Sequence, residues 1–415
     1  MRAWLLGCFL ALAASLPAWA AAPLQPLIDA TPAGGHLTLA PGEYAGPATL
    51  DKPVHLDGGG KAVLRGNANS TVLTLRAGAS ASSIRGLTIT GSGDLHDRVD
   101  AGVLIEGDDN LIEDNRIDDV LFGIHVKQGN RNRIIANRIQ GKPRESGLRG
   151  DGLRLWYSRH NLIQGNHFER VRDLLLTNSP ENRVIGNTLH DGRCSMEIVF
   201  SPNTAVEGNV FTNTDTGIIV LYSPGLVIRA NRVVHARGGG GAGITFKESG
   251  EALVEGNEII DSTVGLSSGP PPSGAAALTI RGNRFAYNII GMYFYGEKSS
   301  HQIAGNRFEQ NLTQVSASTP TAANTNHWQG NYWSDYQGFD RNGDGIGDTP
   351  HQIIAYTDRI WMETPAATFF RNSPALELLD FLERLAPFAA PATILYDPAP
   401  RMQSASRPGD GSLPR

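Results

Sequence analysis

Apolar residues in this chain follow a short alternating pattern that restarts at a regular interval. Stretches rich in Val, Ile and Leu alternate with polar residues, and Asn, Asp and Gly stand at the breaks between them. One phrase recurs, as in VIGN, VEGN, IRGN and IAGN, and most gaps between its asparagines are 21 to 23 residues. The asparagines are Asn115, Asn137, Asn166, Asn187, Asn209, Asn231, Asn257, Asn283, Asn306 and Asn331. A fixed period of this size indicates a solenoid.

The repeat predicts strands rather than helices, because the apolar residues alternate and show no 3.6-residue period. About 22 residues accommodate three short strands and three turns, which make one coil of a parallel β-helix. We therefore expect an all-β fold, a right-handed parallel β-helix of about ten coils over residues 21–350. Asparagine tolerates a left-handed backbone and can bond the coils above and below, so the repeated asparagines predict a stacked structural column.

Two columns of apolar residues are expected to point into the coil. One column holds Ile124, Leu153, Leu174, Met196, Ile218 and Ile244, and the other holds Val126, Leu155, Leu176, Ile198, Val220 and Phe246. Alternate residues of a strand point to opposite faces, so these columns form the core. Met196 is therefore expected to be a core residue rather than a metal ligand, and Met292 in GMYFYG is interpreted in the same way.

Two further columns are expected to point outward. They contain His125, Arg154, Leu175, Glu197, Ile219 and Thr245, and then Lys127, Trp156, Thr177, Val199, Leu221 and Lys247. A solvated face should be polar, yet the middle of this one is apolar. Such a patch marks a binding surface, or else a loop or the C-terminal segment covers it. As a binding surface, its partner-docking residues are Trp156, Leu175, Val199, Ile219 and Leu221.

Both ends of the chain differ from the repeat. Residues 1–20 combine an arginine, an apolar run and an Ala-Trp-Ala ending, which predict a cleaved signal peptide and a periplasmic location. Residues 351–395 are expected to form a capping or docking segment, with a helix after Ser373 whose leucines share one face. Residues 396–415 are rich in Pro and Ser and are expected to be disordered.

Charge and cysteine content exclude some classes of protein. The net charge is −5 and no basic tract is present, which argues against a nucleic-acid partner. Removal of the signal peptide leaves Cys194 as the only cysteine, so no internal disulfide is expected. A single thiol in an exported protein is either buried and inert or used chemically, and the first interpretation is favoured.

A short loop near the end of the repeat resembles a calcium site. In DRNGDGIGD, oxygen ligands come from Asp340, Asn342, Asp344, the Ile346 carbonyl and Asp348. The twelfth position, where calcium loops carry a bidentate glutamate, is His351. The alternative is an Asp/Gly turn without an ion.

Polysaccharide chemistry is the second functional class, because many parallel β-helices cleave or epimerise acidic sugars. Such reactions need carboxylates, or a carboxylate with His, Lys or Arg, on one outward face. Asp119, Asp191 and Asp261 recur at one fixed position and are interpreted as turn residues. Glu197, with Arg154 and His125 on other coils, is the best catalytic cluster. A lyase, hydrolase or epimerase, or a carbohydrate-binding β-helix without activity, is therefore the alternative function.

The repeated asparagines, GDGLRLWYS at 150–158, GNYWSDYQGFDRNGDGIGD and the tail helix together resemble the NosD family over residues 23–400. This resemblance implies a periplasmic, non-catalytic protein that helps to mature the copper sites of nitrous oxide reductase. It also implies an ABC-type complex with an ATP-binding subunit and a permease, copper delivery by a chaperone lipoprotein, and docking of the apo-reductase.

The chain departs from the family pattern at its outward soft ligands. Family members have a motif that resembles RYGxHxMxS, and at residues 193–201 this chain has RCSMEIVFS instead. Glu197 and Val199 therefore stand at the family's His and Met positions. A further family Met corresponds to Leu221. The expected copper region is therefore reduced to Cys194, Glu197 and His125, and we interpret the chain as a divergent member.

Overall fold

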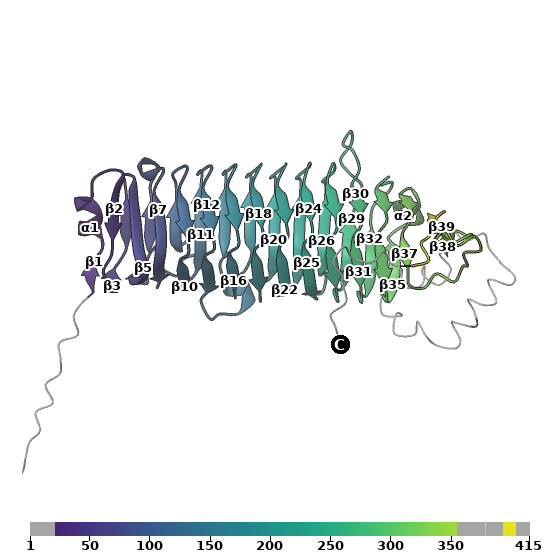
Figure 1. Cartoon of the computed structure of the whole chain (residues 1–415), viewed down its shortest axis with the longest axis horizontal. Coiled ribbons are helices and arrows are strands. Elements are labelled where there is room, and N and C mark those ends of the chain that lie inside the picture. The colour runs from purple at the N-terminus through teal and green to yellow at the C-terminus, as the bar shows by residue number, and fades with distance from the viewer. Residues whose placement is uncertain (1–20, 355–377, 379–392, 404–415) are drawn as a thin grey trace, which may run out of the picture.

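The computed structural model describes residues 21–354, 378 and 393–403, and within these the chain forms the parallel β-helix that the repeat predicts. The strands stack side by side along one long rod (Figure 1). Residues 1–20, the residues of the predicted C-terminal helix other than Leu378, and residues 404–415 lie outside the described part. Among the described residues, no helix is long and apolar enough to cross a membrane.

Each complete coil contributes one strand to each of three parallel stacks. The first stack precedes the repeated asparagine and contains β9 (Leu111–Glu113), β12 (Arg133–Ile135), β15 (Leu162–Gln164), β18 (Arg183–Ile185), β21 (Ala205–Glu207), β24 (Val227–Arg229), β27 (Leu253–Glu255), β30 (Thr279–Arg281), β33 (Gln302–Ala304) and β36 (His327–Gln329). The second stack follows the asparagine and contains β10 (Arg116–Val120), β13 (Arg138–Gly141), β16 (His167–Glu169), β19 (Thr188–His190), β22 (Val210–Thr214), β25 (Arg232–Ala236), β28 (Glu258–Ile260), β31 (Arg284–Ala286), β34 (Arg307–Glu309) and β37 (Tyr332–Trp333).

The third stack is a separate twelve-stranded sheet. It contains β4 (Ala48–Leu50), β6 (Leu73–Leu75), β8 (Ala101–Ile105), β11 (Phe122–Lys127), β14 (Leu153–Trp156), β17 (Leu174–Thr177), β20 (Cys194–Val199), β23 (Thr216–Leu221), β26 (Ala242–Lys247), β29 (Val264–Ser268), β32 (Ile290–Phe294) and β35 (Thr313–Ala317). Ten coils are therefore too few. The additional coils lie at the N-terminal end, where no asparagine marks the turn.

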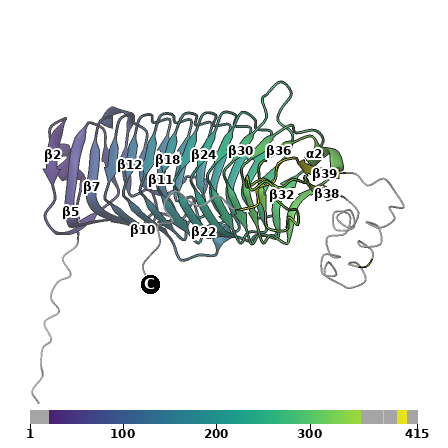
Figure 2. The same ribbon diagram turned by 45° about the vertical axis from the view of Figure 1, so that its right-hand side comes forward.

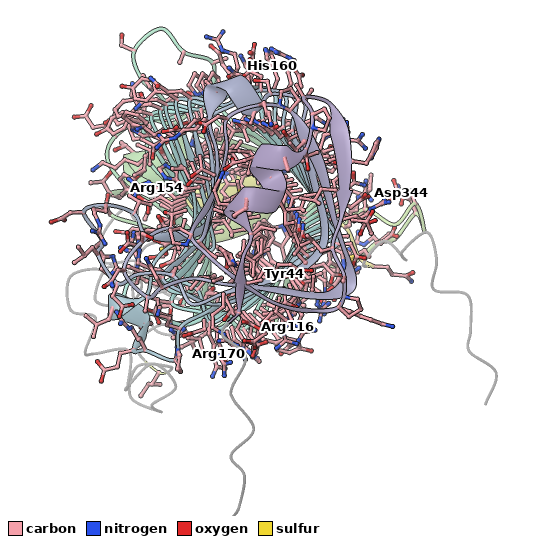
Figure 3. All side chains as sticks on the ribbon, turned by 90° about the vertical axis from the view of Figure 1, so that its left-hand side faces the viewer. Tyr44, Arg116, Arg154, His160, Arg170 and Asp344 are labelled. Carbon is pink, nitrogen blue, oxygen red and sulfur yellow. The ribbon has the colours of Figure 1, made fainter. Side chains whose placement is uncertain are left out.

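The N-terminal coils include two long strands, β5 (Val54–Arg65) and β7 (Ser83–Thr90). They also contain β1 (Ala22–Pro23), β2 (Gly35–Thr38) and β3 (Gly42–Ala45). Helix α1 (Gln25–Ala30) lies across the open end of the rod, as the view along its axis shows (Figure 3). Leu24 and Ile28 are fully buried there. The helix thus shields the first coil from water, as the end of a solenoid requires.

A ladder of buried asparagines joins the coils at the turn between the first and second stacks. The Asn209 Oδ1 accepts the Asn187 backbone N–H at 2.8 Å, and the Asn209 Nδ2 donates to the Asn231 Oδ1 at 2.9 Å. The predicted column of stacked asparagines is confirmed, but the prediction that the asparagines themselves have a left-handed backbone is wrong. The left-handed residue is the one before the asparagine, such as Gly208 with φ +64°, which explains the recurring Gly-Asn pair.

The C-terminal end is closed by a short cap. Helix α2 (Pro320–Asn324) follows β35, and β38 (His351–Ile354) pairs antiparallel with β39 (Thr393–Asp397). Figure 2 shows these elements gathered beside β36. Residues 396–403, expected to be part of a disordered tail, are instead ordered: β39 ends at Asp397, and Arg401 bridges to Tyr332 and Ile346.

Candidate functional site

The outer face of the twelve-stranded sheet carries the predicted outward columns in the predicted register. His125, Arg154, Leu175, Glu197 and Ile219 are successive cross-strand neighbours from β11 to β23. The inward columns, with Met196 and Met292, are fully buried, as expected. Because the register holds, every side chain predicted to point outward lies on this face.

The apolar part of this face, which we call the apolar face, consists of Trp156, Leu175, Val199, Ile219 and Leu221. All five side chains are partly exposed. Val199 and Leu221 are direct cross-strand partners. None of the described loops or cap elements buries them, so within the described residues the face is open to a partner.

Three exposed aromatic side chains extend the apolar face, and the sequence reasoning missed them. Tyr157, Phe200 and Tyr222 occupy the turn directly after β14, β20 and β23, and we call them the aromatic ridge. Their exposed fractions are 53%, 51% and 43%. The Phe200 and Tyr222 rings stack with centroids 4.9 Å apart, and Tyr157 meets the Trp156 ring edge-on at 4.8 Å.

The ridge residues all have left-handed backbones, with φ between 49° and 51°. Bulky side chains are rare in this conformation, which favours Gly and Asn. Asn178 occupies the equivalent place between Tyr157 and Phe200 with φ 49°. The chain therefore holds three aromatic rings at positions where asparagine suits the backbone.

A second ladder anchors the ridge. The backbone N–H groups of Ser158, Ser179 and Ser201 donate to the hydroxyl of the serine on the next coil at 2.8 to 3.0 Å. Ser223 continues the ladder to Ser249. The sequence contained a signal for this ladder and for the ridge. The serines recur at an interval close to that of the asparagines, and an aromatic residue, Asn or Glu precedes each of them.

An ionic row lies at the other end of the same strands. The buried Asp151 carboxylate accepts two hydrogen bonds from Arg172, at 3.0 and 2.8 Å, and Arg193 binds the buried Asp173. Burial raises the pKa of Asp151 to about 6, although Arg172 opposes the shift. Burial and Asp173 raise the pKa of Glu197, whose carboxylate lies 3.5 Å from Arg193.

This row gives weak support to polysaccharide chemistry. Asp151 and Asp173 are fully buried and bound to arginines, so of the three carboxylates only Glu197 reaches solvent. Burial, then Arg154 and Lys127, lower the pKa of His125 to about 4, so its imidazole is neutral near pH 7. The catalytic role predicted for Glu197 stays a prediction.

The described residues fit a copper centre poorly. Cys194 is buried, and burial and Asp173 raise the pKa of its thiol to about 12, which keeps it protonated. Copper prefers a thiolate, imidazole or thioether. No group of three His, Cys, Asp or Glu side chains among the described residues could hold a metal ion. Copper ligation by Cys194, Glu197 and His125 therefore stays a prediction without structural support.

The calcium-like loop lies far from this face. Along the rod axis, Arg154 and Asp344 appear on opposite sides (Figure 3). The loop's oxygens accept backbone bonds within the loop: the Asp340 carboxylate accepts N–H groups of Gly343 and Gly345, at 2.7 and 2.8 Å. These bonds are those of a tight Asp/Gly turn. These hydrogen bonds do not indicate a calcium ion, and calcium binding by the five residues stays a prediction.

Residues 135–338 match the family model described as periplasmic copper-binding protein (NosD). A relative in Pseudomonas aeruginosa, named probable ABC transporter binding protein NosD, is 28% identical over 386 residues, which cover 85% of each chain. A relative of the same name in Stutzerimonas stutzeri is 28% identical over 382 residues, covering 83% of this chain and 82% of that one.

Among solved structures, the catalytic domain of a GH87 α-1,3-glucanase in complex with nigerose superposes with a TM-score of 0.57. It is 12% identical, and the alignment covers 71% of this chain and 64% of the glucanase chain. Such a likeness shows the shared β-helix fold and leaves the function open. The family model, which matches residues 135–338, and the two relatives, which extend over most of the chain, support a divergent member of the NosD family.

Proposed function

We propose that this protein is a non-catalytic accessory factor of the periplasm that supports copper-site maturation of nitrous oxide reductase together with an ABC-type transporter. In this role the rod holds the apo-reductase while copper passes from a chaperone lipoprotein to it. The ATP-binding and permease subunits are the remaining partners. The observation that carries the proposal is the aromatic ridge beside the apolar face.

Exposed aromatic side chains are the residues that most often anchor protein interfaces. Each ridge residue also holds a strained backbone, which costs about 1 kcal/mol or more. Folding alone would favour asparagine there, as at Asn178. A partner that buries Phe200 and Tyr222 supplies the reason for retaining them, and Lys127 and Lys247 on the flanks add charge at the rim.

Copper is cargo in this proposal. The protonated, buried Cys194 and the fully buried Met196 are poor ligands, so we assign the metal to the partners and the positioning to this chain. The retained face explains how a member that lacks the family's outward His and Met positions can still serve in maturation.

Binding of purified apo-reductase to the immobilised mature chain tests the proposal. We expect Phe200→Asn with Tyr222→Asn to weaken binding at least about tenfold, because two anchoring rings are lost. Val210, an exposed apolar residue of β22 outside the twelve-stranded sheet, provides the control, and Val210→Thr should bind normally. Unchanged affinity in the double variant contradicts the docking role of the ridge.

Anaerobic Cu(I) titration against a competing chelator separates docking from metal carriage. We expect the isolated mature chain and its Cys194→Ser variant to bind Cu(I) equally weakly. Tight binding that is lost in Cys194→Ser contradicts the scaffold model and assigns the thiol to a copper site.

A further inference from the structure

A polar groove at the C-terminal end of the rod lies apart from the docking face. Its lining comes from β33, β36, α2 and β39, and Figure 2 shows β36, α2 and β39 close together. Its volume is about 950 Å³, within the usual range for small-molecule sites. The side chains that the argument uses are Gln302, Asn324, His327, Gln329 and Tyr396.

The polar side chains of this groove have unused hydrogen-bonding capacity. Gln302, Asn324, His327 and Gln329 are exposed and make no side-chain hydrogen bonds to the described residues. Gln302 and His327 are cross-strand partners, and Gln329 follows two residues along β36, on the same face of the sheet. Amides and a histidine thus present donors and acceptors side by side.

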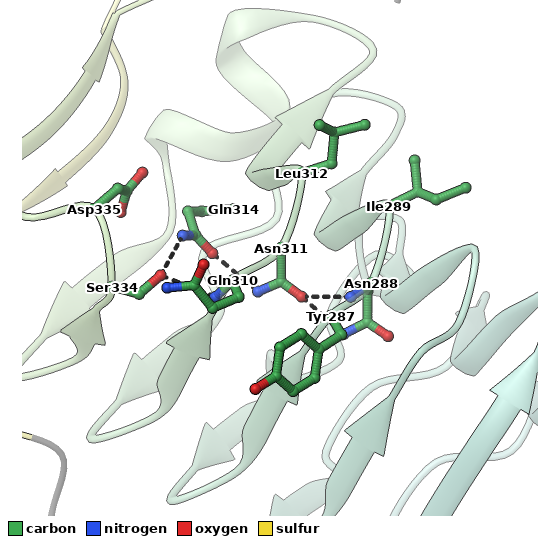
Figure 4. A pocket seen from close by; sticks show the side chains of 9 residues that line it. All are labelled: Tyr287, Asn288, Ile289, Gln310, Asn311, Leu312, Gln314, Ser334 and Asp335. Carbon is green, nitrogen blue, oxygen red and sulfur yellow. Dashed lines mark hydrogen bonds between the residues drawn. The ribbon is translucent and has the colours of Figure 1, made fainter.

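A second pocket at another corner of the rod provides the contrast. There the buried amides bond one another: Asn288 donates to Asn311 at 2.9 Å, and Asn311 donates to Gln314 at 2.9 Å (Figure 4). Gln314 in turn donates to Ser334 at 3.2 Å. These amides are engaged in closing the last coils and have little capacity left for a ligand.

The groove also has an aromatic wall on a rigid floor. Tyr396 projects from β39 with an exposed fraction of 49%, and its hydroxyl makes no hydrogen bond to the described residues. The lining also includes the buried Trp328, whose ring centroid lies 5.9 Å from that of Phe294 and 5.7 Å from that of Trp333. A fixed floor keeps the amides of β33 and β36 in place before a ligand binds.

The described residues that line the groove include no lysine, arginine, aspartate or glutamate. An acidic sugar would find no lysine or arginine there to pair with its carboxylate. A neutral sugar ring presents vicinal hydroxyls that amides can bond and a C–H face that packs on an aromatic ring. Without a carboxylate, the described part of the lining lacks the acid pair that glycoside cleavage ordinarily uses.

We propose that the groove formed by β33, β36, α2 and β39 binds a neutral oligosaccharide without cleaving it. Tyr396 stacks on one ring, and Gln302, His327 and Gln329 bond its hydroxyls. This site is separate from the docking face, so the maturation role can be correct or wrong independently of it.

Calorimetric titration of the mature chain with maltohexaose, laminarihexaose, chitohexaose and hexamannuronate tests the proposal. We expect at least one of the three neutral sugars to bind and hexamannuronate to bind at least about tenfold more weakly. Binding of none of the neutral sugars at millimolar concentration, or stronger binding of hexamannuronate, overturns the proposal.

Two variants locate the site. Tyr396→Ala should weaken the binding of the neutral sugar by about five- to tenfold, the effect of losing one stacking contact. Gln329→Leu keeps the side-chain size but removes the amide, and it should weaken the binding of the sugar to a similar extent. Tyr287→Ala, at the pocket of Figure 4, is the matched control and should bind normally. Normal binding by both groove variants overturns the assignment, and an unchanged thermal midpoint shows that they fold.

Discussion

At the scale of single residues, buried polar groups determine how the coils join. His301 is the clearest example, because its ring is fully buried in the first turn of the penultimate coil. Its Nδ1 accepts the Leu278 backbone N–H at 3.1 Å, and its Nε2 lies 3.1 Å from the Ser268 hydroxyl. A ring that accepts at Nδ1 must be neutral. Burial accordingly lowers the pKa of His301 to about 4, while its bond to Gly269 opposes the shift.

This shift predicts an acid-sensitive C-terminal end. Between pH 6.5 and 4 the unfolded chain binds a proton at this histidine and the folded chain does not, so acid lowers the free energy of unfolding. From pH 7 to pH 5 the loss amounts to about 2 kcal/mol. Asparagine can accept the same N–H and does not titrate, so His301→Asn should remove this loss. Urea unfolding at both pH values measures it.

His160 provides the control, since its imidazole is on the surface and 3.2 Å from Glu181. His160→Asn should retain most of the wild-type difference between pH 7 and pH 5. The assignment to His301 is wrong if both variants lose the same amount of stability on acidification.

At the scale of elements, the sequence was sufficient wherever a repeated residue marked the register. The asparagine interval placed Ile124, Leu153 and Leu174 in one inward column, and the structure confirms it. The N-terminal coils fell within the predicted β-helix but were not counted, because β5 and β7 run through the corner that the asparagine marks elsewhere. The aromatic ridge was missed because its residues belong to a turn, and the alternation of strands assigns no face to a turn.

The asparagine ladder predicts a large cost for removing one rung. Asn209→Ala deletes the donor to Val184 O and the acceptor for the Asn187 backbone N–H, both in the core. Buried groups without partners cost about 1–3 kcal/mol each, so we expect at least about 3 kcal/mol less stability. Gln164→Ala, on the exposed face of β15, should change it by less than about 0.5 kcal/mol. Chemical unfolding compares the two, and equal effects would show that the ladder adds little.

At the scale of the whole molecule, the rod ends where Asp397 replaces the next asparagine of the ladder. Its fully buried carboxylate accepts the Asn331 backbone N–H at 3.0 Å, the Asn331 Nδ2 at 2.9 Å and the Trp333 indole N–H at 3.1 Å. It also accepts the Gly330 N–H at 3.0 Å. No local pattern reveals this role, because 65 residues separate Asp397 from Asn331 and the nearer segment looks like a tail.

In a solenoid each coil contacts only its neighbours, so losing the terminal cap should open one end and spare the other. Asp397→Ala removes the acceptor of three buried N–H groups, two of Asn331 and one of Trp333, which should lower local stability by about 3 kcal/mol or more. Amide exchange over residues 327–354 should then accelerate more than about a hundredfold, while residues 101–200 stay unchanged. Asp335→Ala, an exposed acid next to the same coil, is the control. If protection falls equally along the whole rod, the coils unfold as one unit and Asp397 stabilises the entire molecule. The restricted pattern instead means that the sugar groove, which β39 helps to form, can be lost while the aromatic ridge remains folded.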